Sequence, residues 1–512
     1  MLAAGTASDL SHVERPSLPL AGSSRLFAGP RALLGLAGLY AASRLLGLVR
    51  EIGIAFFFGT STAADRFGAA FVVAGLASIV GGEALYAGSV RWLSEGRLER
   101  SAIFTESRYA DLVAVGQRAA VAATAAFALL GPVVTLLVLG RLEHAGATIA
   151  LTVALAPSVG ASFLVACVNA RLTLERRFAL LNGAPILYSA GALVGLAVIV
   201  IIGSGVGPLP VAAGWSAGNV AAALALYARA RPTQVKRNSL SASSLGVLRI
   251  GMPLAIAFSL VAVQGLTDRA VAARLGTGSV AALSYADRLF LLPIGFVIAA
   301  IGPMVLGALV AERQSKQRIG TVAREQLRIL VASVIPLGFL FAAVGPRLVS
   351  LVFQSGNFDA RSAELTVAAL DGLSVGIAAV ALSLVLFRMM QAVSQLREIV
   401  VVSLGAVVLN AILSVAGAVW IGLYGVTLST SLVALAVIGL QVMRLARPLG
   451  DAWAANAFKH AVFPTFVCSM LSIVVVAAYH RHLLGEFGRG LALITLAGLS
   501  ATYISRMRQQ VG

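Results

Sequence analysis

Charged side chains inside long apolar stretches are the residues of this sequence whose types and positions could do chemistry. Arg44, Arg50 and Arg288 lie in or at the ends of stretches long enough to cross a membrane. A charge within such a stretch costs about 2.5–3.5 kcal/mol on insertion scales and by default indicates a functional site. A guanidinium group presents a fork of donors that suits phosphate oxygens. The three arginines therefore predict a site for an anion such as the pyrophosphate of a lipid headgroup.

Neighbouring carboxylates offer a second interpretation, in which these arginines only hold helices together. Glu51 follows Arg50, and Asp287 precedes Arg288. Both interpretations stay open for Arg50, whereas Arg44 has no carboxylate within six residues on either side. We expect Asp287 to be the local partner of Arg288.

Two further acids, Asp65 and Glu83, belong to the second apolar stretch. Asp65 begins this stretch next to Arg66, which we expect to be an anchor at the membrane interface. Glu83 lies well inside the stretch and either binds a proton or stays a neutral, hydrogen-bonded acid. We expect Asp65 and Glu83, together with Asp287, to tune the charge of a cavity or to carry a coupling cation.

The sequence has no recognisable catalytic constellation, which predicts a protein that is not an enzyme. Its five histidines lie in tails, loops or at the ends of apolar stretches, without a serine or cysteine at a catalytic spacing. No cysteine and histidine cluster has metal-ligand spacing, and we expect no cofactor. Asn410, a polar residue inside an apolar stretch, either helps to hold a sodium ion or bonds to a neighbouring helix.

The elements that must position these residues are membrane-spanning helices. Hydrophobic residues make up 59% of the 512 positions and charged residues 12%, about half the charged fraction of a soluble domain. A run of about 20 apolar residues spans a bilayer as a helix. The sequence predicts an all-α polytopic membrane protein with about fourteen spans, near 29–50, 65–90, 113–139, 147–170, 181–203, 208–228, 247–273, 279–310, 327–352, 364–388, 398–420, 422–443, 459–478 and 487–505.

Basic residues alternate between the predicted connections, and this pattern explains the net charge of +18. Of the 39 lysines and arginines, 28 fall on the side that holds the two termini, and six on the other side. The positive-inside rule then places both termini in the cytoplasm. Because the basic residues are spread over every second loop rather than gathered on one face, we expect no nucleic-acid partner.

Two similar strings, Ala64-Asp65-Arg66-Phe67 and Ala286-Asp287-Arg288-Leu289, indicate an internal duplication. They stand 287 − 65 = 222 residues apart, and each follows a Gly-Thr turn. An even number of spans separates the copies, which indicates a parallel repeat of two six-helix halves around a central cavity. We predict a cytoplasmic tail at 1–28, an N-terminal lobe at 29–230, a cytoplasmic linker at 231–244, a C-terminal lobe at 245–445, and two further spans with a tail at 446–512.

The residues from Ser43 to Glu51, read with the two duplicated strings, resemble the MviN/MurJ family of lipid II flippases. This family belongs to the multidrug/oligosaccharidyl-lipid/polysaccharide exporter superfamily. Ordered matches continue at Glu175–Phe178, Leu351–Asp359 and Tyr424–Leu432. Each motif alone is weak, but the ordered set is specific. Fourteen spans and cytoplasmic termini are also what the family has.

The resemblance implies a protein of the bacterial inner membrane that moves a polyprenyl-pyrophosphate-linked glycan by alternating access. Its partners would be this lipid-linked substrate, membrane lipids and enzymes of envelope synthesis. The energy source stays open among the membrane potential, protons and sodium. By motif, Arg44, Arg50 and Arg288 fall where the family has cavity arginines, Asp65 where it has an essential aspartate, and Glu83 where it has a glutamate.

Two departures from the family pattern leave the cargo open. Ser78 stands where family members that flip lipid II carry a cavity arginine, and Phe387-Arg388-Met389 stands where they have Phe-Tyr-Ala. Lipid II is the leading cargo, and an exopolysaccharide or O-antigen repeat unit is the alternative. A multidrug exporter would need a more apolar or acidic cavity. A membrane glycosyltransferase would need a large extramembrane loop with paired acids.

Overall fold

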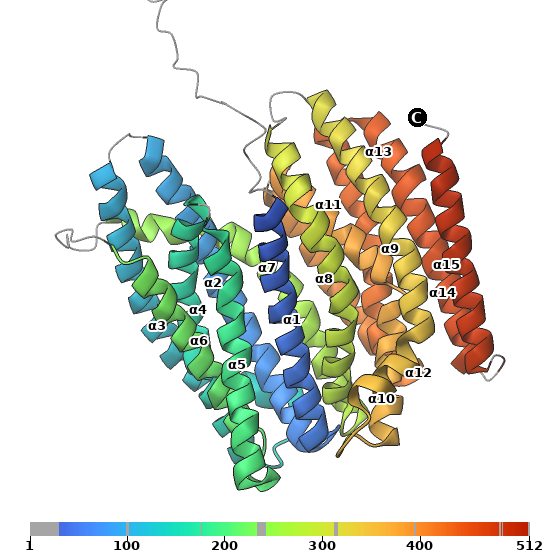
Figure 1. Ribbon diagram of the computed structural model, residues 1–512, viewed down its shortest axis with the longest axis horizontal. Coiled ribbons are helices and arrows are strands. Elements are labelled where there is room, and N and C mark those ends of the chain that lie inside the picture. Colours follow the sequence, from blue (N-terminus) through green and yellow to red (C-terminus); the bar gives the residue numbers. More distant parts are fainter. Residues whose placement is uncertain are drawn as a thin grey trace, which may run out of the picture.

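The computed structural model describes residues 30–98, 102–175, 177–232, 242–311, 316–393, 396–480, 483 and 485–509. All regular secondary structure within these ranges is helical, which confirms the predicted all-α class. Most of the helices run roughly parallel to one another, along the vertical direction of Figure 1. The predicted tail at 1–28 and most of the predicted linker lie outside the described residues.

Six long helices form the N-terminal half. Small residues let their backbones approach closely: a Cβ on Gly191 of the fifth helix would overlap the carbonyl oxygen of Gly214 on the sixth. The helices are α1 (Pro30–Phe58), α2 (Thr62–Leu98), α3 (Ala102–Leu139), α4 (Ala145–Leu174), α5 (Phe178–Ile202) and α6 (Leu209–Arg229), with a short 3₁₀ turn, η2 (Ser204–Val206), before α6.

The C-terminal half has a helical pair at its edge, and the predicted repeat of the first half stays a prediction. In Figure 1 this pair, α14 and α15, lies on the far side from the N-terminal half. The helices are α7 (Ala242–Leu275), α8 (Ser279–Ala311), α9 (Lys316–Phe353), α10 (Ala360–Ser374), α11 (Ile377–Val393), α12 (Leu396–Leu449), α13 (Asp451–Ala457), the π-helical turn η3 (Phe458–Val462), α14 (Phe463–His480) and α15 (Glu486–Gln509).

Two breaks in helical geometry explain how the observed helices correspond to the fourteen predicted spans. α10 and α11 are bent by 53° relative to each other and are long and apolar enough to cross a membrane only when taken together; we call this pair the broken span. α12 leaves helical geometry at Ile421 and Gly422, where Gly422 takes a φ of 63°, so it supplies the predicted eleventh and twelfth spans. Among the described residues, eight helices are long and apolar enough to cross a membrane, and the bent pair makes a ninth.

α7 lies between the two halves. It packs along α2 on one side and along α12 on the other. The approach to α2 is close, because a Cβ on Gly88 would overlap the carbonyl oxygen of Val247. The predicted boundary between the lobes at 231–244 stays a prediction, and helix contacts across the boundary are extensive.

The outer surface of the bundle is apolar, as a lipid-facing surface must be. Large hydrophobic side chains are exposed along helices of both halves, and these include Leu129, Leu137, Ile201, Val419 and Trp420. In water such a surface would be an aggregation liability, whereas in hydrocarbon it is solvated. Between the helices lie buried charged groups, among them Arg50, Glu51, Asp268 and Arg489.

Candidate functional site

Arg50 and Arg288, which come from different halves of the chain, share one carboxylate. Arg50 on α1 is buried, and its Nη2 lies 2.6 Å from Oε1 of Glu51. On α8, Nε of Arg288 lies 3.0 Å from the same oxygen. Glu51 therefore joins the first helix to the eighth.

The predicted pairing of Asp287 with Arg288 is wrong. Asp287 instead forms an ion pair with Arg269 of α7. Adjacent residues on a helix point about 100° apart, so Asp287 faces α7 while Arg288 faces α1. Arg288 therefore does not pair with the carboxylate next to it in sequence. Arg50 does pair with its sequence neighbour, Glu51, as expected.

Arg44, Arg50 and Arg288 line one cavity of about 280 Å³. Arg44 and Arg50 differ by about 120° in facing on α1, as their spacing predicts. The cavity is wide enough for both to reach it. The wall is completed mainly by α5 and α6 of the N-terminal half and by α8, with Ser43, Gly47, Leu48, Asn182, Pro185, Tyr188, Ser189, Trp215, Leu291 and Leu292.

Aromatic rings hold two of these guanidinium groups. The Cζ atom of Arg50 lies 4.6 Å from the ring centroid of Trp215 and 5.1 Å from that of Phe71. The Cζ atom of Arg288 lies 5.6 Å from the centroid of Phe71. Cation–π contact fixes a guanidinium by its face and leaves its N–H edge for other partners. The Nε–H of Arg50 is buried and has no hydrogen-bond partner, so Arg50 retains one donor for a further acceptor.

A second, larger cavity of about 500 Å³ lies within the N-terminal half, next to the first. Tyr188 and Trp215 line both cavities. Glu83 lies on the wall of the larger cavity, and so does Ser78, the residue at the expected arginine position. The other lining residues are mostly small, aromatic or amide side chains: Phe71, Ala74, Gly75, Ile79, Gly82, Tyr86, Ser158, Ser162, Val165, Ala166, Asn169, Thr173, Leu181 and Asn219.

Asp65 lies away from both cavities and caps a helix of the other half. Its carboxylate accepts hydrogen bonds from the backbone N–H groups of Gly278 at 2.7 Å and Ala281 at 2.9 Å. These groups belong to the first turn of α8, where donors lack helical partners and the dipole favours negative charge. Asp65 thus ties α2 to α8, although its sequence position gave no sign of a cap between halves.

Further hydrogen bonds join the halves at the same end of the bundle, which we call the latched end. The Tyr285 hydroxyl donates to the carbonyl oxygen of Gly59 at 2.8 Å. The Asn357 backbone N–H donates to the carbonyl oxygen of Phe56 at 2.8 Å. The hydroxyls of Thr60 and Ser362 lie 2.9 Å apart. The α1–α2, α7–α8 and α9–α10 connections meet there, at the lower edge of Figure 1.

Asp359 stands at the latched end outside the spans and caps α10. Its Oδ1 accepts a hydrogen bond from the backbone N–H of Ser362 at 2.8 Å. Hydrogen bonding to the side chain and backbone of Ser362 holds the pKa of the Asp359 carboxyl below its usual value. The cap therefore stays ionised at neutral pH and fixes the start of the broken span.

A buried cluster of oxygen atoms surrounds Asp268 of α7. Asn410 Nδ2 donates to its Oδ1 at 2.8 Å, Ser414 Oγ donates to the same atom at 2.6 Å, and Thr430 Oγ1 donates to Oδ2 at 3.0 Å. Asn410, the predicted sodium candidate, thus bonds a neighbouring helix. Its own Oδ1 is buried without a hydrogen-bond partner. No group of three acids, cysteines or histidines that could hold a metal ion occurs among the described residues.

A comparison with protein-family models finds one described as "Lipid II flippase MurJ", which matches residues 54–497. The chain belongs to the MurJ lipid II flippase family. It is therefore a transporter rather than an enzyme, and a multi-pass protein of the bacterial inner membrane. A search of curated proteins finds no significant match.

Solved structures agree with this family at the level of the fold. A "Lipid II flippase MurJ, inward closed conformation" superposes with a TM-score of 0.73 at 17% identity, over 93% of this chain and 99% of that chain. An inward-facing "multidrug resistance MATE family transporter of the MOP superfamily" reaches 0.64 at 15% identity, over 86% and 99%. An outward-facing transporter of the same description reaches 0.59 at 15% identity, over 81% and 96%.

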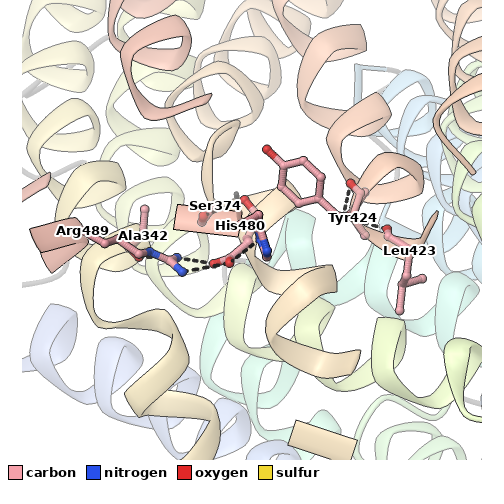
Figure 2. A network of polar contacts seen from close by, with 8 residues as sticks. Ala342, Ser374, Leu423, Tyr424, His480 and Arg489 are labelled. Carbon is pink, nitrogen blue, oxygen red and sulfur yellow. Dashed lines mark hydrogen bonds and ion pairs between the residues drawn. The ribbon is translucent and has the colours of Figure 1, made fainter. Parts of the chain in front are cut away.

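The sequence patterns missed three residues that the flippase fold brings to important positions. Glu51 was seen only as a partner of Arg50, and Trp215 was not singled out. Arg489 is one of the six basic residues counted on the side away from the termini, yet it is buried against Asp371 (Figure 2). An arginine near the start of a predicted span is equally compatible with a position in water and with a buried ion pair. The sequence alone therefore could not reveal that Arg489 is buried.

Proposed function

We propose that this protein flips lipid II and that Arg44, Arg50 and Arg288 bind its pyrophosphate. The observation that carries the proposal is the cavity of about 280 Å³ lined by all three arginines. With Glu51 included, the site holds three positive charges and one negative charge, 3 − 1 = +2. This excess complements the negative charge of a pyrophosphate. The same positive charge would repel the cationic compounds that a multidrug exporter carries.

Glu51 keeps the arginines together while the cavity is empty. An arriving pyrophosphate offers several acceptor oxygens to the same N–H groups and competes with the carboxylate for them. Arg288 then exchanges its partner on α1 for the substrate. Because α1 and α8 belong to different halves, this exchange links substrate binding to the contact between the halves.

The latched end is the closed gate of this cycle, and we place it on the outer face of the membrane. The charge distribution supports the orientation, because 28 basic residues fall on the side that then faces the cytoplasm and six on the other. In this orientation both termini are cytoplasmic. Release of the substrate outward requires the Asp65 cap and the neighbouring hydrogen bonds to break.

The larger cavity receives the glycan portion of the substrate. Its aromatic rings, Tyr86, Tyr188 and Trp215, offer apolar faces to sugar rings, and Asn169 has a buried Oδ1 with no partner. Glu83 accepts hydrogen bonds from hydroxyl or amide groups. The arginine-free wall at Ser78 also suits an uncharged exopolysaccharide repeat unit, which stays the alternative cargo.

The cluster around Asp268 is the coupling site, with sodium as its ion. The carboxylate of Asp268 and the buried Oδ1 of Asn410 are hard oxygen ligands of the kind that such cations take, and the hydroxyls of Ser414 and Thr430 add two more. Enzymes of envelope synthesis supply the lipid-linked substrate on the cytoplasmic face, and surrounding membrane lipids solvate its chain.

Complementation of a strain depleted of its lipid II flippase tests this proposal. The wild-type chain should restore growth, whereas Arg44→Ala and Arg288→Ala should not, at equal amounts of membrane-inserted protein. Arg118→Ala is the matched control, because Arg118 is an exposed arginine on α3 that lines neither cavity. Growth with Arg44→Ala and Arg288→Ala would refute the arginine site. Failure of the wild type, with export of an exopolysaccharide unit instead, would favour the alternative cargo.

A further inference from the structure

The last helix reaches into the C-terminal half through one buried arginine. Arg489, in the first turn of α15, is 1% exposed. Its Nη1 donates to Oδ2 of Asp371 on α10 at 2.9 Å, and its Nη2 donates to Oδ1 of the same carboxylate. Nη2 also donates to the carbonyl oxygen of Ala342 on α9 at 2.8 Å. Figure 2 shows this fork entering the network from α15.

The end of α14 meets the same carboxylate. His480 Nε2 lies 3.1 Å from Oδ2 of Asp371, and the His480 ring lies 5.1 Å from the ring of Tyr424 on α12. The guanidinium of Arg489 lies 4.7 Å from the ring of Tyr479. Both helices of the C-terminal pair are therefore fastened to one buried acid.

Asp371 stands three residues before Ser374, where α10 ends and the bend toward α11 begins. From α12, the Ser431 hydroxyl donates to the carbonyl oxygen of Gly372 at 2.6 Å. Gly376 approaches Ser431 so closely that a Cβ there would overlap it. Two helices thus contact the chain at the break, α12 through Ser431 and α15 through Arg489.

The broken span forms the support of α8. Both α10 and α11 pack along α8, the helix that carries Arg288 and receives the Asp65 cap. The bend of 53° between α10 and α11 consequently sets the surface on which α8 rests. A change in the bend would move Arg288 relative to Arg50 on the other half.

We propose that Arg489 is a positioning residue for transport: by binding Asp371 it fixes the bend of the broken span and makes α14 and α15 move as one body with the C-terminal half. This inference rests on the proposed function for its transport readout. The pair acts on the conformational step and not on substrate binding, since Arg489 and Asp371 line neither cavity.

The test compares four proteins: wild type, Arg489→Gln, Asp371→Asn and the double variant. Each single substitution removes one partner of the buried ion pair and leaves the other partner without compensation. Such a loss strongly destabilises the folded arrangement around the pair. Each single variant should slow flipping in liposomes by about tenfold or more, and the double variant should recover most of that loss. Binding of a short-chain pyrophosphate lipid should change less than about twofold in all four, because the arginine cavity is intact.

A distance measurement separates positioning from simple stability. Spin labels at Glu364 on α10 and Leu491 on α15, both exposed, report the contact between α15 and the broken span. The native cysteines, Cys167 and Cys468, are first replaced. The single variants should broaden the label-to-label distance distribution, and the double variant should narrow it again. Glu398→Gln is the matched control, because it removes an ion pair with Arg444 and Arg447 elsewhere in this half.

Three results would overturn the proposal. Arg489→Gln could flip at the wild-type rate, or it could show the wild-type distance distribution, or it could lose substrate binding in parallel with flipping. If Arg489→Gln does not accumulate, Arg489→Lys keeps the charge without the fork and gives the same comparison. Failure of the wild-type protein to flip the lipid would contradict the proposed function instead, while the distance measurement would still report on the pair.

Discussion

The Oε1 atom of Glu51 lies 3.0 Å from Nε of Arg288, and this contact joins α1 of one half to α8 of the other. The same oxygen lies 2.6 Å from Nη2 of Arg50. A carboxylate held between two arginines is a built-in competitor for any anion that binds them. Under the proposed function, the substrate must displace this acid from the two arginines.

Replacing Glu51 by glutamine removes the competitor while it keeps the shape of the side chain. A charge-assisted hydrogen bond contributes about 1.5–3 kcal/mol, so we expect a pyrophosphate lipid to bind about tenfold more tightly to Glu51→Gln. Flipping should become slower, because the bound anion is released less readily. Titration of the purified protein measures the affinity, and a liposome assay measures the rate. An unchanged affinity would show that Glu51 does not compete with the substrate.

The Asp65 cap predicts a difference between two substitutions. Asparagine keeps only one of the two acceptor oxygens and turns an NH2 donor toward the second N–H, whereas alanine loses both acceptors. Asp65→Asn should therefore raise the open fraction of the latched end about fivefold, for a loss of about 1 kcal/mol, and Asp65→Ala should raise it further. A cysteine at Ser284, which is half-buried near the latch, reports opening by its labelling with a membrane-impermeant thiol reagent. Equal labelling of the two variants would exclude a capping role.

Most of the fold can be predicted from the sequence, because few backbone structures are stable in the hydrocarbon core of a membrane. Backbone groups in lipid must be satisfied internally, so long apolar runs are helices. The fourteen predicted spans each correspond to a helix, a bent pair or half of a kinked helix among the described residues. What the apolar runs could not show is the 53° bend after Ser374, since the residues that contact this part of the chain come from α12 and α15, far away in sequence.

The site is readable only in part. Arg44, Arg50 and Arg288 stand out because charge is costly in apolar stretches, and the structure brings them to one cavity. Their partners do not stand out. Asp287 is adjacent to Arg288 in sequence but faces another helix, and Asp65 binds backbone N–H groups 213 and 216 residues away. Such pairings depend on helix rotation and packing, which residue spacing does not determine.

An arginine at position 78 tests how the larger cavity chooses its cargo. The cavity of about 500 Å³ has room for the side chain, and Glu83 on the same wall offers a partner. If the cargo is lipid II, Ser78→Arg should keep or increase flipping, because the resemblance places a cavity arginine there. A loss of more than about tenfold, or about 1.4 kcal/mol, would indicate a headgroup that needs the uncharged wall. Ser78→Gln controls for size.

Removal of the Asp268 carboxylate should abolish any dependence of transport on sodium. Asp268→Asn keeps the hydrogen-bonding shape of the cluster but removes the charge that a cation needs. We expect wild-type flipping to rise with sodium concentration at constant ionic strength, and Asp268→Asn flipping to be slow and flat. Potassium replaces sodium in the control series. A wild-type rate that is the same in both salts would argue for another energy source.

Two glycines with positive φ make a matched pair for the latched end. Gly59 has a φ of 50° and Gly422 a φ of 63°. A Cβ at Gly422 meets open space, but one at Gly59 would overlap the backbone carbonyl of Asn357. A left-handed conformation costs a residue with a Cβ about 1–2 kcal/mol, so both Gly59→Ala and Gly422→Ala should lower the thermal midpoint of the protein.

Only Gly59→Ala should also open the latched end, because the backbone of Asn357 must move away from α1 to make room for the new Cβ. The Asn357 N–H donates to Phe56, so this movement breaks a hydrogen bond between the halves. The thiol labelling at Ser284→Cys should rise for Gly59→Ala and stay at the wild-type level for Gly422→Ala. Parallel increases in both variants would mean that labelling follows global stability, and the close approach of Gly59 to Asn357 would then have no gating role.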